Sequence, residues 1–108
     1  MDDIEYRLRY LPKFYEDLEE KAVYIAEKLN NPQAANDLID EVERAIMKRV
    51  PIAEVFEAYP SIKEREHTYY RIYVNNFVIY YVVIEDEHLG KIMEVRRFLY
   101  NKQNQNIV

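Results

Sequence analysis

A chain of 108 residues, 49% of them hydrophobic and 14% aromatic, has enough apolar side chains for one folded domain and too little length for two. The absence of cysteine excludes a disulfide scaffold, a thiolate zinc site and a cysteine nucleophile, and with only two histidines we expect no metal or other cofactor. The net charge of −5 argues against general nucleic-acid binding, because phosphate contacts need lysine and arginine. We therefore expect one domain, residues 1–108.

The first half of the chain predicts a strand followed by a helical hairpin. Apolar and charged residues alternate over residues 4–10, as in a strand with one buried face, and Pro12 is suited to the first turn of a helix. Apolar residues then recur every three or four positions over residues 13–29. They are Phe14, Leu18, Ala22, Ile25 and Leu29.

A second helix is expected to begin immediately after a short break. Asn31 is a suitable N-cap and Pro32 a suitable first helical residue, while Val50-Pro51 ends the apolar periodicity. Two helices joined by so short a connection must lie antiparallel.

The second half predicts three consecutive strands at residues 68–74, 77–84 and 91–100. Asn75-Asn76 forms a tight turn, and the 77–84 segment is apolar on both faces, which indicates a central strand. Strict alternation in the last strand places Met93, Val95 and Leu99 on one face, and Glu94, Arg96 and Tyr100 on the other. The expected fold is α+β: an N-terminal strand and an antiparallel helical hairpin packed on a small antiparallel sheet.

Nothing in the sequence suggests export or membrane insertion. The first residues lack a basic region followed by an apolar run, and the apolar stretch 77–84 is too short to span a bilayer. We expect a cytoplasmic protein with no membrane contact.

Positive charge is concentrated near the end of the chain. From residue 91 onward the chain contains one acid, Glu94, and four basic residues, Lys91, Arg96, Arg97 and Lys102. A basic patch of this kind is hidden in the total charge.

Four blocks of sequence carry a resemblance to a known family. They read YRLRYLPKFYEDL at 6–18, PQAANDLI at 32–39, YRIYVNNFVIYYVV at 70–83 and RFLYNKQN at 97–104. In order and spacing they resemble the RelE/ParE family of small α+β toxins, in which an aspartate–leucine pair lies in the first helix and a histidine or tyrosine ends the last strand.

The resemblance implies the toxin of a type II toxin–antitoxin module, held in a hetero-oligomer by a cognate antitoxin. RelE-like members cut messenger RNA on the ribosome without a metal, whereas ParE-like members inhibit DNA gyrase, and the fold does not choose between these targets. A degenerate, non-toxic relative that only binds an antitoxin is a third reading. Tyr15, Val23 and Tyr24 on the hairpin are candidate antitoxin contacts or, alternatively, core residues that face the sheet.

The resemblance also assigns candidate site residues. Tyr100 occupies the family's histidine/tyrosine position, where it would stack on a base or transfer a proton, and Arg96, Arg97 and Lys102 would clamp phosphate. Arg71 on the neighbouring strand would join them. Since adjacent strand residues face opposite ways, Arg96 and not Arg97 should share the face of Tyr100.

Each of these residues also has a structural reading. Tyr100 is one of 11 tyrosines and would pack, and Arg71 would be a surface charge or an antitoxin contact. Arg96 and Arg97 would pair with Glu94 and with the acidic helices. One departure weakens the nuclease reading. The ribosome-dependent nucleases typically carry an arginine where this chain has Val78.

Overall fold

The computed structural model describes residues 5–56, 58 and 67–101. The elements follow the predicted order, β1 (Tyr6–Tyr10), α1 (Pro12–Val23), a π-helical turn (Tyr24–Lys28), α2 (Pro32–Arg49), a 3₁₀ turn (Val50–Ile52), β2 (Tyr69–Val74), β3 (Phe77–Asp86) and β4 (Gly90–Tyr100). The predicted strand, helical hairpin and three final strands are thereby confirmed. Two predictions, the start of the first strand at Ile4 and the site residue Lys102, lie outside the described residues.

Local signals in the sequence explain where the helices begin. Pro12 occupies the first turn of α1, and Pro32 that of α2. Asn31 is the N-cap of α2, because its side-chain oxygen accepts a hydrogen bond of 3.1 Å from the backbone N–H of Ala34. The end of the first helix differs from the prediction: the chain widens into the π-helical turn, and Leu29 is 57% exposed instead of joining the core.

The sheet has the strand order β1-β4-β3-β2, so β3 is an inner strand, as its two apolar faces predicted. The strands β2, β3 and β4 form the expected antiparallel meander. The prediction of a wholly antiparallel sheet was wrong, because β1 pairs in parallel with β4, from Tyr6 opposite Lys91 to Tyr10 opposite Val95. The long connection through the helices and the meander permits this parallel pairing, which no tight turn allows.

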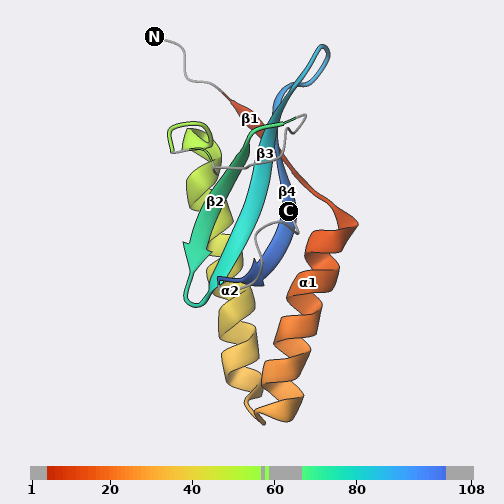
Figure 1. Ribbon diagram of the computed structural model, residues 1–108, viewed down its shortest axis with the longest axis vertical. Helices are drawn as coiled ribbons and strands as arrows, with labels where there is room; N and C mark the ends of the chain where they lie inside the picture. Colours follow the sequence, from red (N-terminus) through yellow and green to blue (C-terminus); the bar gives the residue numbers. More distant parts are fainter. Residues whose placement is uncertain (1–4, 57, 59–66, 102–108) are drawn as a thin grey trace.

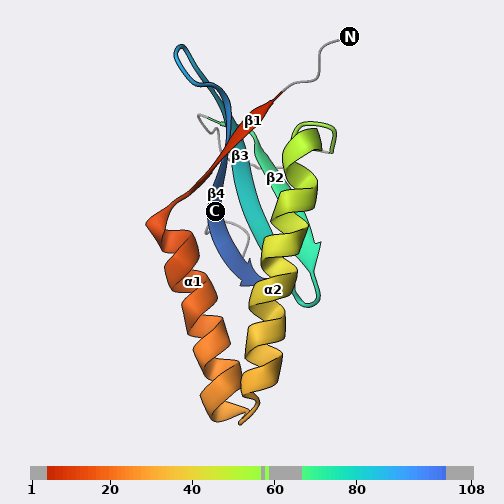
Figure 2. The same ribbon diagram turned by 180° about the vertical axis from the view of Figure 1, so that it is seen from behind.

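Both helices cover the same face of the sheet, which we call the helix face (Figures 1 and 2). They meet at the turn after the π-helical segment and diverge toward their other ends (Figure 2). α1 packs mainly on β4, and α2 packs on β2. The core between the layers consists mostly of fully buried side chains, among them Phe14, Val42, Ile46, Ile79, Tyr81, Met93, Val95 and Phe98.

A β-bulge interrupts the pairing of β3 with β4. Tyr81 pairs with Val95 and the preceding Tyr80 with Arg97, so Arg96 is an extra residue in β4. Strict alternation therefore fails after Val95: Phe98 packs in the helix-face core, whereas Leu99 joins the opposite face. The predicted partition of the last strand was wrong for this reason, since a bulge shifts every later side chain to the other face.

The described helices carry charged faces along their length, and neither has the continuous apolar stretch that crossing a membrane requires.

A polar cluster anchors the chain after α2 to β1 and β4. Glu54 accepts hydrogen bonds from the Tyr6 hydroxyl at 2.9 Å and from Lys91 Nζ at 2.5 Å. The Lys91 hydrogen bond is the main reason that the pKa of Glu54 lies below its usual 4.5. Burial, followed by the hydrogen bond to Glu54, raises the pKa of Tyr6.

This cluster predicts a small pH-dependent contribution to stability. A carboxylate whose pKa is lowered on folding stabilises the protein above its unfolded pKa, and the contribution is lost as pH falls through the folded value. We expect wild type to lose more unfolding free energy than Lys91→Met between about pH 5.5 and pH 3, by less than about 1 kcal/mol because the pair is partly exposed. Urea denaturation at several pH values measures this, with Lys13→Met as the control. Parallel curves for wild type and Lys91→Met would contradict it.

Candidate functional site

The sheet face turned away from the helices, here called the distal face, carries an apolar centre and a polar surround. Val78, Tyr80, Val82 and Leu99 form a second buried cluster there, each no more than 3% exposed. Arginine side chains from β1, β2 and β4 surround this cluster. The distal face is therefore the part of the described sheet where guanidinium groups gather.

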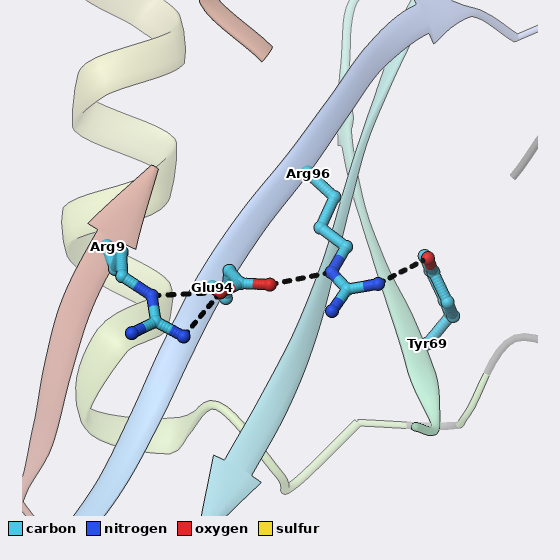
Figure 3. Close-up of polar contacts among 4 residues, drawn as sticks. All are labelled: Arg9, Tyr69, Glu94 and Arg96. Atoms are coloured by element: carbon cyan, nitrogen blue, oxygen red, sulfur yellow. Dashed lines mark hydrogen bonds and ion pairs between the residues drawn. The ribbon is translucent and has the colours of Figure 1, made fainter. Parts of the chain in front are cut away.

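Arg96 is held in place by two partners on this face (Figure 3). Its Nε donates a hydrogen bond of 2.8 Å to Glu94 Oε1, and its Nη1 donates one of 3.0 Å to the Tyr69 hydroxyl. The other oxygen of Glu94 accepts hydrogen bonds of 2.8 and 2.5 Å from Nε and Nη2 of Arg9. One carboxylate thus bridges two arginines that come from neighbouring parallel strands.

The positive charges of this bridge outnumber its negative charge. The Glu94 side chain is only 5% exposed, so its charge needs compensation, and the two guanidinium groups leave a net charge of about +1 on the network. Burial lowers the pKa of Arg96, but its hydrogen bonds to Tyr69 and Glu94 and the nearby negative charge outweigh burial, and the pKa is raised overall. Arg96 is therefore a permanent cation.

Arg71 lies on the distal face as well. Its position in β2 pairs with Tyr80, a member of the distal cluster. The Arg71 guanidinium carbon lies 5.7 Å from the centre of the Tyr73 ring, a cation–π distance, and Tyr73 is 55% exposed. The structure thus brings Arg71 and Arg96 to one face, with an exposed tyrosine beside Arg71.

Arg97, in contrast, is directed to α1. Its Nε and Nη2 donate hydrogen bonds of 2.7 and 3.2 Å to the two oxygens of Asp17, and the backbone N–H of Phe98 donates a third of 3.0 Å. β1 pairs with only part of β4. Beyond that part, the buried Asp17 carboxylate takes the place of a neighbouring strand as the acceptor for a backbone N–H of β4. The aspartate of the aspartate–leucine pair in the first sequence block thus has a structural role here.

Tyr100 lies on the helix face and is 40% exposed. The centre of its ring lies 4.9 Å from that of Phe77, and Nζ of the buried Lys21 lies 5.2 Å from it. The expectation that Tyr100 and Arg96 share a face was wrong, because the bulge at Arg96 reverses the alternation between them. Lys21 was missed by the sequence analysis; its spacing of four residues from Asp17 on one helix was the available signal.

The structural reading in which Arg96 pairs with Glu94 is confirmed, whereas Arg9 and Tyr69 were not predicted as members of this network. The alternating pattern of β1 predicted that Arg9 lies on the face of the strand away from the core. Its position opposite Glu94 follows only from the parallel pairing of β1 with β4. Val78, the position at which the resemblance leads one to expect an arginine, is fully buried in the distal cluster.

The two helices offer a different kind of surface. A cleft of about 200 Å³ opens between α1 and α2, bordered by Tyr15, Leu18, Glu43 and Met47. Tyr15 is 54% and Met47 59% exposed. Further along the hairpin Val23 and Tyr24 are also exposed, at 44% and 50%.

Within residues 5–56, 58 and 67–101, no three histidine or acidic side chains converge as metal ligands. No protein-family model matches the chain, and no curated protein matches it in sequence.

Proposed function

We propose that this chain is the toxin of a type II toxin–antitoxin pair of the RelE/ParE type, and that it arrests growth by acting on messenger RNA at the ribosome. The observation that carries the proposal is the gathering of Arg9, Arg71 and Arg96 on the distal face of a domain whose total charge is −5. Arginines held on a rigid sheet suit the bidentate contacts that phosphate groups accept.

Metal-independent RNA cleavage needs cations for the phosphate as well as a proton acceptor and a proton donor. Arg71 and Arg96 supply the cations in this proposal. Tyr73 is the exposed tyrosine beside Arg71, whereas Tyr100 and Arg97 contact α1 residues and serve packing in the described part of the chain.

Gyrase inhibition is the second candidate. It is favoured by the diversion of Arg97 to Asp17 and by the valine at position 78 in place of an arginine, because both leave fewer groups for catalysis. Inhibition by binding needs a complementary surface and no acid or base.

The partner that this proposal requires is a cognate antitoxin bound to the two helices. The interhelical cleft presents the exposed apolar side chains of Tyr15 and Met47, with the acid Glu43 at its border. An amphipathic segment with apolar anchors and basic flanks is complementary to such a groove. Toxin and antitoxin would then form a hetero-oligomer that leaves the distal face to the target or to a further antitoxin segment.

The test is growth arrest on expression without an antitoxin. We expect wild type to reduce colony counts, and the double variant Arg71→Ala/Arg96→Ala to restore them by about 100-fold, since each lost cation removes part of the stabilisation of the phosphate. Arg44→Ala, at an exposed position of α2, is the matched control and should remain toxic. Thermal unfolding of the purified variants verifies that they are folded.

Two further measurements identify the target. Cleavage sites mapped on reporter transcripts support the nuclease, while intact transcripts together with loss of gyrase supercoiling activity support the second candidate. Normal growth on wild-type expression would reject both and leave the non-toxic, antitoxin-binding alternative.

A further inference from the structure

The network of Arg9, Glu94, Arg96 and Tyr69, here called the Glu94 network, links more side chains than an ordinary surface ion pair. It joins side chains of β1, β4 and β2 across the distal face (Figure 3). Exposed ion pairs contribute little, but this one centres on a carboxylate that is nearly buried. Such an arrangement fixes the direction of the guanidinium groups.

The network leaves hydrogen-bonding capacity unused. With respect to the residues that the structure describes, Arg9 and Arg96 each use two of their five N–H groups in these bonds. The Arg9 side chain is 46% exposed and that of Arg96 25%, so both are accessible from solvent. The remaining donors can therefore meet an anion.

The apolar residue beneath the network, here called its floor, strengthens an interaction with an anion. Val82, which is fully buried, pairs with Tyr69 on one side and with Glu94 on the other. An apolar floor lowers the local dielectric constant, so charges above it interact more strongly than in bulk water.

We propose that the Glu94 network is a phosphate-binding site in which Arg9 and Arg96 contact the ligand, while Glu94 and Tyr69 are positioning residues that hold Arg96. The ligand is a phosphodiester group of a single-stranded RNA backbone. This inference rests on the proposed function, since it states how the RNA target is held. The site takes a single phosphate because its excess charge is about +1.

The experiment measures binding and does not depend on toxicity. Inorganic phosphate and, separately, a short single-stranded RNA are titrated into ¹⁵N-labelled protein while the arginine Nε–H signals are followed by NMR. The variants are Arg9→Met and Glu94→Gln, with Arg44→Met as control for loss of a surface arginine and Glu85→Gln, at an 81% exposed carboxylate, as control for loss of an acid.

We expect both ligands to shift the Arg9 and Arg96 signals, and RNA to displace phosphate. Arg9→Met should weaken RNA affinity about tenfold and reduce the dependence of log affinity on log salt by about 0.7, the value for one phosphate contact to a single strand. Glu94→Gln should weaken it similarly and broaden the Arg96 signal, because the guanidinium is no longer held. The two controls should bind as wild type.

Unmoved Arg9 and Arg96 signals, or equal affinities for Arg9→Met and Arg44→Met, would overturn the inference even where Glu94→Gln fails to fold. Shifts with free phosphate that RNA cannot compete away would overturn the assignment to an RNA backbone. RNA binding that follows the expected pattern in a protein that does not arrest growth would support the site and reject the toxin proposal.

Discussion

Replacing Asp17 by alanine is expected to lower the free energy of unfolding by about 3 kcal/mol, the loss typical of breaking a buried ion pair on one side. Asp17 is the acceptor for two N–H groups of Arg97 and for the backbone N–H of Phe98. Its removal leaves the mostly buried guanidinium of Arg97 and the backbone N–H of Phe98 without their acceptor. Each donor that loses its hydrogen bond then carries its own desolvation cost.

Urea denaturation of Asp17→Ala gives this value directly, and Glu20→Ala, at an exposed site on the same helix, is the control. The double variant Asp17→Ala/Arg97→Met separates the causes. It should be more stable than the sum of the two single variants predicts, because the unpaired cation is gone. A loss below about 1 kcal/mol in Asp17→Ala would show that α1 does not depend on this carboxylate.

Replacing Phe98 by alanine should cost about 4 kcal/mol, in the range of buried phenylalanine truncations. The Phe98 side chain is fully buried, and its ring centre lies 4.8 Å from that of Phe77 and 6.3 Å from that of Phe14. It therefore joins β4 both to β3 and to α1. The rest of the fold keeps these elements in place, so they cannot move together to close the cavity that its removal leaves.

The conservative variant Phe98→Leu should lose much less, because leucine refills most of the volume. Thermal and urea unfolding of both variants are the measurements. If alanine and leucine cost the same, the helix-face placement of Phe98 would be wrong, and with it the bulge that creates that placement.

The residues of the candidate site differ in how far their placement could be predicted from the sequence. Arg71 and Arg96 could be named from the sequence, because Arg71 lies within the block at 70–83 and Arg96 directly precedes the block at 97–104. Tyr100 was placed on the wrong face, since no local pattern marks Arg96 as an inserted residue. Glu94 appeared as a lone acid in a basic segment, and its bridging role depends on Arg9, 85 residues away along the chain.

The sequence alone determined the elements of this protein, because apolar periodicity, proline positions and the Asn31 cap act within a few residues of one another. It also determined that β3 is central, since a strand with two apolar faces must be covered on both. Only the tertiary structure decided the parallel partner of β1, the bulge at Arg96 and the attachment of Arg97 to Asp17. These features arise between segments far apart in the chain, where strand pairing and side-chain contacts are selected by the packing of the whole domain.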